Sequence, residues 1–141
     1  MAKIKLSDTL RFLSAQLNTF TGGSLELTIQ VDDQEVSVGE VLRARVAVSA
    51  PEGKNYTLSC VTISLRGQVQ REGKWESYAQ RAEAAHEVPL PGGHEYVIPI
   101  VIKIPQEAVL SEDGGNWRLR CQALVDRSID PRDEAVVNVV A

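Results

Sequence analysis

The sequence has few of the residues from which catalytic and metal sites are built. It contains two cysteines, two histidines and one methionine among 141 residues. Two cysteines are too few for a disulfide scaffold or a closed zinc site. Neither His86 nor His94 has a sequence neighbour that indicates a metal site or a triad, and no nucleophile motif is present. We therefore expect no enzymatic activity, no cofactor and no metal.

Long apolar runs and an excess of positive charge are also missing. No apolar stretch approaches the roughly 20 residues that span a bilayer, and the N-terminus lacks the apolar core of a secretory signal. The net charge is −4, with no basic patch interleaved with aromatic residues. These features exclude a general nucleic-acid binder, and we expect a cytoplasmic protein. With 43% hydrophobic residues, the chain is long enough for one domain with a core.

Beyond residue 24, apolar and polar residues alternate, which is the period of a half-buried β-strand. In the segment 117–126, Trp117, Leu119 and Cys121 share one face, and Arg118 and Arg120 share the other. Strands are predicted at 25–31, 42–48, 61–69, 75–78, 82–90, 98–104, 117–126 and 135–140. Residues 80–85 alone would favour a helix, although the alternation across 82–90 and two nearby prolines favour an edge strand. About seven to nine strands without a βαβ pattern predict an all-β, immunoglobulin-like antiparallel sandwich over residues 22–141.

The first 21 residues follow a different pattern. Apolar residues recur there at spacings of three and four, which predicts an amphipathic helix ending in a hinge at 21–24. The apolar stripe consists of Leu6, Leu10, Leu13, Leu17 and Phe20. Four interpretations stay open: the helix packs on the sandwich, it self-associates, it contacts a membrane surface, or the segment is an organelle presequence that is removed. The membrane interpretation is not favoured, because the positive charge of this segment is small.

Three groups of short motifs resemble the arrestin-like superfamily, and within it the sporulation-control protein family. Residues 38–46 resemble a P-G-E-x-V-x-G-x-V strand, and 61–67 resemble a V-x-I-x-L-x-G strand. Residues 93–105 and 117–133 resemble the late strands, which end in a D-x-x-x-D-P-x-D turn. Val38 and Ala44 depart from the family's usual Pro and Gly. The resemblance implies one arrestin-like sandwich, where arrestins have two, and a protein-binding scaffold or adaptor without enzymatic activity. An edge strand that accepts an extended partner segment would suit such a module.

Five arginines are the candidate partner-binding residues. Each lies on a predicted outward face, and they would form a cationic stripe if their strands shared one sheet. They are Arg43, Arg45, Arg66, Arg118 and Arg120. Such a stripe would receive an acidic peptide or a phosphate group; the alternative is ordinary pairing with polar neighbours across strands.

An acidic turn and two thiols complete the candidates for chemistry. Asp126, Asp130, Asp133 and Glu134 offer oxygen ligands for a cation such as Ca²⁺. They lack the spacing of a known calcium loop, however, and Asp-Pro is ordinary turn chemistry. The strand phases place Cys121 in the core and Cys60 on an outward face, so we expect no disulfide between them.

The sequence therefore predicts a non-catalytic interaction module of arrestin-like type with unidentified protein partners. The alternative is a structural or self-assembling protein, a homo-oligomer formed through the N-terminal helix or an edge strand.

Overall fold

The structure is a computed structural model that describes residues 25–126 and 130–141. The described residues form β-strands, one 3-10 turn and loops, with no α-helix among them. The helix predicted for residues 1–20, including Leu6, Leu10, Leu13, Leu17 and Phe20, lies outside the described residues. The elements are β4 (Glu26–Val31), β5 (Val36–Ser37), β6 (Val41–Ser49), β7 (Tyr56–Arg71), β8 (Lys74–Leu90), β9 (Glu95–Lys103), η1 (Ser111–Asp113), β10 (Trp117–Val125), β11 (Arg132–Val137) and β12 (Val139–Val140).

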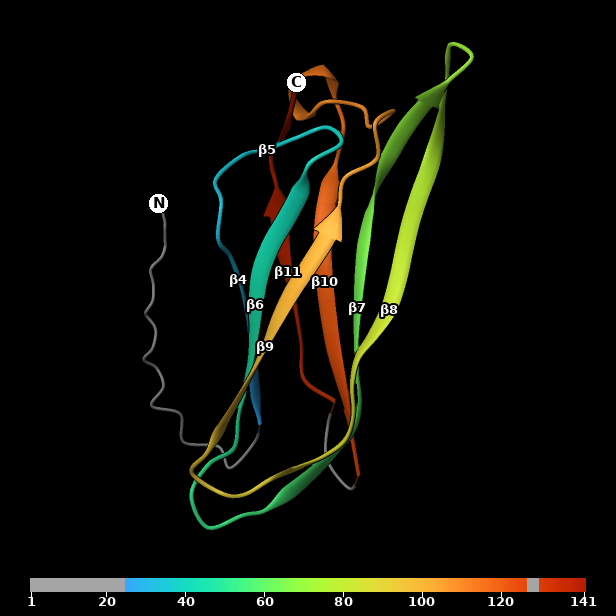
Figure 1. Ribbon diagram of the computed structural model, residues 1–141. Coiled ribbons are helices and arrows are strands. Elements are labelled where there is room, and N and C mark those ends of the chain that lie inside the picture. Colours follow the sequence, from blue (N-terminus) through green and yellow to red (C-terminus); the bar gives the residue numbers. More distant parts are fainter. Residues whose placement is uncertain (1–24, 127–129) are drawn as a thin grey trace.

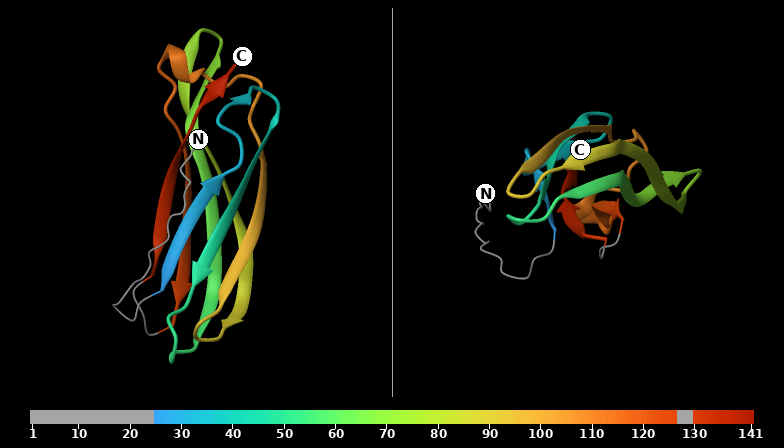
Figure 2. Two further views of the ribbon diagram at one scale, coloured as in Figure 1. Left: turned by 90° about the vertical axis from the view of Figure 1, so that its left-hand side faces the viewer. Right: turned by 90° about the horizontal axis from the view of Figure 1, so that it is seen from below.

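Two antiparallel sheets pack face to face around one core (Figures 1 and 2). One sheet has the strand order β11-β10-β7-β8, and the other has the order β4-β6-β9. The short strands β5 and β12 pair in parallel beside them. Along β6 and β10 the burial alternates strictly, so that the apolar face predicted from the sequence is the face that points into the core. The all-β prediction is confirmed for the described residues.

The longest strands form the hairpin of β7 and β8. Its turn is Glu72-Gly73, with φ of 51° and 77°, the pair of positive angles that a two-residue type I′ turn requires. The sequence predicted separate strands at 75–78 and 82–90, but β8 runs without interruption from Lys74 to Leu90. The helix propensity of residues 80–85 is overridden there, because each residue from Gln80 to Glu83 pairs with β7.

A tryptophan joins three strands near one end of the four-stranded sheet. Trp117 is 1% exposed, and its indole Nε1 donates a hydrogen bond to the carbonyl oxygen of Val109 at 2.8 Å. Its ring lies on the backbone of Gly67 in the adjacent strand β7, where an added Cβ would sit 2.2 Å from the ring atoms. Tyr78 of β8 packs beside the indole, with 5.8 Å between ring centroids. One side chain therefore joins β10, β7, β8 and the loop that precedes β10.

The two sides of the sandwich are built differently. On one side β4 and β11 are joined, because the Ile29 N–H donates a hydrogen bond to Asp133 Oδ2 at 2.9 Å. On the other side β8 and β9 are connected by the turn at 91–94 but belong to different sheets and do not pair with each other. No strand among the described residues pairs with the outer edge of either β8 or β9.

We predict that Gly67→Ala destabilises the protein by roughly 2–3 kcal/mol, because the new methyl group overlaps the Trp117 ring and forces the sheet or the indole to move. Urea unfolding measures the change. Gly73→Ala is the matched control, because its Cβ would meet no atom within 4 Å and only the φ of +77° penalises it, at about 1 kcal/mol. Equal losses for the two variants would contradict the packing argument.

Candidate functional site

The five candidate arginines lie on two opposite faces of the sandwich. Arg66, Arg118 and Arg120 project from the outer face of the four-stranded sheet, where Arg118 is the register partner of Arg66. Arg43 and Arg45 belong to β6, in the three-stranded sheet. The single stripe considered from the sequence therefore does not form, because its strands do not share a sheet. That these residues bind a partner stays a prediction.

The arginines of the four-stranded sheet surround a shallow hollow of about 260 Å³. Glu134 of β11 lies between two of them, with its carboxylate oxygens 3.3 Å from Arg118 Nη1 and 3.0 Å from Arg120 Nη2. Arg118 Nε also donates a hydrogen bond to Asn116 Oδ1 at 3.2 Å. Within residues 25–126 and 130–141, the Arg66 side chain makes no ion pair or hydrogen bond, in contrast to Arg118 and Arg120. The hollow thus has three guanidinium groups and one carboxylate, and this excess of positive charge suits an anionic group.

Some residues of this surface were not identified from the sequence. Arg81 of β8 is the register partner of Ser64, which in turn is paired with Arg120, so Arg81 extends the cationic row on the same face. Gln68 Oε1 accepts a hydrogen bond from the Asn116 N–H at 2.7 Å and holds the start of β10 at the rim of the hollow. Arg81 was missed because it lies in 80–85, where helix and strand patterns compete and the direction of a side chain is undefined.

The opposite face has weaker features. Arg45 Nε lies 3.3 Å from Asp32 Oδ1, so its charge is partly compensated by the strand-end aspartate. Arg43 is the register partner of Val101 on β9, which is 61% exposed. Val97, on the same strand, is 48% exposed. This face is therefore mixed, with cations beside exposed valines.

A cluster of Cys60, Glu83 and His86 lies on the outer face of the four-stranded sheet. The Cys60 thiol donates a hydrogen bond to Glu83 Oε2 at 2.8 Å, and His86 Nδ1 lies 3.4 Å from the same oxygen. The hydrogen bond to the Glu83 carboxylate raises the pKa of Cys60. A nucleophilic cysteine needs a partner that lowers its pKa, so this arrangement keeps the thiol protonated and unreactive.

The second thiol is inert for another reason. Cys121 is fully buried, and desolvation raises its pKa to about 12. Cys60 and Cys121 are both free, which confirms that they form no disulfide. Their placement, with Cys121 in the core and Cys60 outward, agrees with the strand phases.

Each aspartate of the acidic turn accepts a hydrogen bond from a different part of the protein. Asp126 Oδ1 accepts from the Ser59 hydroxyl at 3.2 Å, and Asp130 Oδ1 accepts from the Val125 N–H at 2.9 Å. Asp133 Oδ2 accepts from Ile29 of the other sheet. The three carboxylates are thus directed at separate donors. Among the described residues, no group of three or more His, Cys, Asp or Glu side chains converges to hold a metal ion.

In the described part of the chain, no helix has the length and apolar character needed to cross a membrane.

A comparison with protein families matches residues 13–141 to the Spo0M family, described as SpoOM protein. No significant match is found among curated proteins. In the crystal structure of Spo0M, a sporulation control protein from Bacillus subtilis, a similar fold is found with a TM-score of 0.63 and 13% identity. The alignment covers 84% of this chain and 50% of that chain, so this chain spans half the length of that protein.

Two further solved structures are similar in fold. AvmM, which catalyses macrocyclization in alchivemycin A biosynthesis, has a TM-score of 0.57 at 9% identity, covering 85% of this chain and 90% of that one. The Pseudomonas fluorescens alkylpurine DNA glycosylase AlkC, bound to DNA containing an abasic-site analogue, has a TM-score of 0.50 at 14% identity, covering 85% and 31%. At such low identities these likenesses establish the fold alone.

We predict that Asp133→Ala costs roughly 1–3 kcal/mol of stability at neutral pH, because the Ile29 N–H loses its acceptor. Asp133→Asn keeps an acceptor oxygen and should cost less than about 1 kcal/mol. Urea unfolding of the two variants beside the wild type measures both effects. Equal losses in both variants would argue against a role for the hydrogen bond.

The same pair of variants has a predicted pH dependence. Burial raises the pKa of Asp133 above its ordinary value of 3.8, so the native state holds this proton more tightly than the unfolded state does. The wild type should therefore lose stability relative to Asp133→Asn as the pH rises from the unfolded pKa through the native pKa, and the difference should be constant above it. A difference that grows in favour of the wild type with rising pH would show that the pKa is lowered.

Proposed function

Because this chain belongs to the Spo0M family, we propose that it is a regulatory, non-catalytic protein-interaction module, an adaptor or scaffold of arrestin-like type. Support for a regulatory role comes from the Bacillus subtilis protein of similar fold, which is a sporulation control protein. The aligned region covers half of that protein's chain. The match to the family supports the arrestin-like resemblance that the sequence motifs indicated.

Support for a non-catalytic role comes from the chemistry of the described surface. The half-buried thiol of Cys60 is kept protonated by its hydrogen bond to Glu83, and the carboxylates of the acidic turn are directed at backbone and hydroxyl donors. The hollow at Arg66 contains three guanidinium groups, amides, the Glu134 carboxylate and the Ser77 hydroxyl. Glu134 pairs with Arg118 and Arg120, so it is not directed as a base at a nucleophile. Such a surface is suited to binding an anionic group and not to transforming one.

The observation that carries the proposal is the hollow on the four-stranded sheet. Arg66 lies beside the Arg118–Glu134–Arg120 network and has no ion-pair partner of its own among the described residues. An acidic side chain of a partner protein would pair with Arg66 and share the two other guanidinium groups with Glu134. The proposed ligand of this surface is therefore an acidic segment of a regulatory protein partner.

Quantitative affinity capture from the cells that produce the protein tests this function. Arg66→Glu, and the double variant Arg118→Glu with Arg120→Glu, should each reduce partner recovery at least tenfold, because every change places a carboxylate opposite the acidic ligand. The double variant Arg43→Glu with Arg45→Glu is the matched control, since these arginines lie on the other sheet. The same partners in equal amounts with all four proteins would contradict the proposal.

One observation favours a second candidate function, self-assembly. The outer edges of β8 and β9 have no pairing strand among the described residues, and a free edge is able to pair with another chain. Light scattering separates the two functions. The interaction module is expected to have the monomer mass of 15.4 kDa at micromolar concentration. A stable multiple of this mass would instead favour the self-assembling protein.

A further inference from the structure

On the side where β8 and β9 lie, which we call the open side, the smaller sheet has one strand fewer than the sheet that faces it. Four strands of one sheet face three strands of the other, so β8 extends beyond the opposing layer. The exposure of β8 shows this directly. Gln80 and Ala82 are exposed, although their register partners on β7, Leu65 and Ile63, are buried. At Gln80 and Ala82 the inner face of β8 is therefore not covered by an opposing strand among the described residues, and this vacant place lies next to β9.

The backbone of β9 presents hydrogen-bonding groups to this place. At its two ends, Ile104 N–H donates to the Glu40 carbonyl oxygen at 2.9 Å, and Ala50 N–H donates to the His94 carbonyl oxygen at 3.0 Å. These bonds direct the even-numbered residues toward β6. Because main-chain groups alternate along an antiparallel strand, the odd-numbered residues direct theirs to the free edge. Val97 and Val101 supply both N–H and C=O groups there, and Pro99 between them supplies only its C=O.

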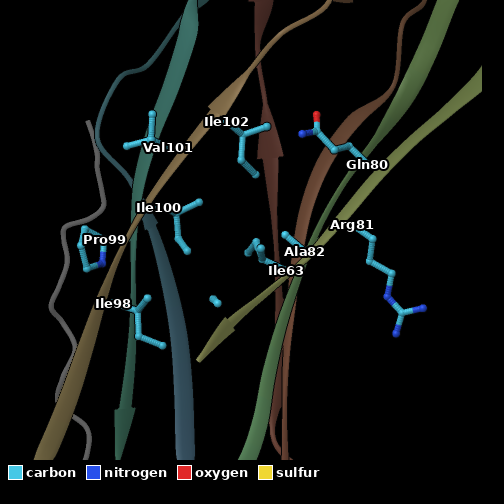
Figure 3. A pocket seen from close by; sticks show the side chains of 10 residues that line it. Ile63, Gln80, Arg81, Ala82, Ile98, Pro99, Ile100, Val101 and Ile102 are labelled. Carbon is cyan, nitrogen blue, oxygen red and sulfur yellow. The ribbon is translucent and has the colours of Figure 1, made fainter. Parts of the chain in front are cut away.

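A groove of about 210 Å³ lies beside this edge, lined mostly by aliphatic residues together with Gln80 and Arg81. Figure 3 shows Ile98, Ile100 and Ile102 pointing into it from β9, with Ile63 and Ala82 on the facing side. Pro99 and Val101 point away from the groove in the same view. The volume is below the 300–1,000 Å³ typical of small-molecule sites. It suits one or two aliphatic side chains, and these would come from a strand that pairs with β9.

We propose that an extended segment of a partner protein adds to the free edge of β9 as the fourth strand of the three-stranded sheet. Its main chain pairs with Val97 and Val101, and aliphatic side chains at alternate positions enter the groove against Ile63 and Ala82. The missing N–H at Pro99 weakens the pairing and keeps it reversible. This mode of binding rests on the proposed function as a protein-interaction module, and it uses a surface separate from the arginine hollow.

A second copy of the chain is a poorer occupant than a partner segment. The free β8 edge would bring polar residues and alanine to the groove, with Gln80 and Ala82 on its inner face. The free β9 edge of a second copy would bring another Pro99 to the pairing. Neither described edge offers branched aliphatic side chains at alternate positions together with an uninterrupted row of N–H donors.

Hydrogen exchange of the full chain tests the edge first. In the free protein, the Val97 and Val101 amides should exchange rapidly, and those of Ile98, Ile100 and Ile102 should exchange slowly because they bond to β6. Slow exchange of Val97 and Val101 in the dilute free protein would overturn the proposal, because the edge would already be occupied by the chain itself.

A random library of displayed 12-residue peptides is the binding probe. Selection on the full chain should enrich peptides with aliphatic residues at positions i, i+2 and i+4, and a bound peptide should slow exchange at Val97 and Val101. Val101→Pro removes one N–H at the free edge and should weaken binding about tenfold. Val101→Ala keeps that N–H and should bind within about threefold of the wild type. Melting curves of both variants check that they fold.

The outcomes separate this inference from the proposed function. Peptides that bind Val101→Pro as well as the wild type, or a selection without alternating aliphatic residues, overturn strand addition at β9. If such peptides lose binding with Arg66→Glu instead, the arginine hollow remains the binding surface and the proposed function stands. A dimer that Val101→Pro dissociates would make a second copy the occupant and would also overturn the inference.

Discussion

The contact between the Trp117 indole and the Gly67 backbone is the constraint on which the four-stranded sheet depends. A strand residue without a side chain is needed at position 67, because the ring occupies the space where a Cβ would lie. The indole Nε1 also donates a hydrogen bond to Val109 in the loop before β10, and the ring packs against Tyr78 on β8. A buried aromatic side chain stabilises the fold through the apolar area that it buries, and the hydrogen bond of its N–H group fixes the orientation of the ring. The register of β7 and β10 that this contact accompanies also brings Arg66 next to Arg118.

The edge proposed for strand addition follows from the difference between the two sides of the sandwich. The Asp133 carboxylate on β11 accepts a hydrogen bond from the Ile29 N–H on β4 and so connects the two sheets. Burial at this position removes part of the hydration of the carboxylate, which is unfavourable for its charged form. On the other side the hairpin of β7 and β8 leaves the opposing sheet, so an edge and a groove remain open. A side closed by a side-chain hydrogen bond is a poor place for strand addition. Of the two free edges on the open side, β8 and β9, the groove favours β9 for the proposed addition, and Pro99 limits indiscriminate pairing there.

Alternating polarity was sufficient to predict most strands and their buried faces. Cys121, Leu119 and Trp117 point inward as their spacing predicted, because burial of one sheet face enforces a period of two. The length of β8 was not predictable from local propensity, since pairing with β7 decides the conformation of residues 80–85. For a related reason, the sequence did not show that the arginines lie on two different sheets. Strand phase gives the face of a residue, but only the order of strands tells whether Arg43 and Arg66 share a sheet. Which strands have a free edge also depends on the order of the strands in each sheet.

The two proposed surfaces act over different distances, which makes them complementary. The protein carries a net charge of −4, so the arginine hollow is a local positive field on an acidic molecule. Such a field extends over about one Debye length, roughly 8 Å in physiological salt, and orients an acidic partner before contact. The groove beside β9 acts only on contact, through main-chain bonds and the burial of aliphatic side chains. Because the hollow is on the outer face of β7, β10 and β11 and the edge belongs to the other sheet, one segment bound at β9 leaves the arginines free. A module with these two surfaces is able to hold two segments at once, which is the physical requirement of a scaffold.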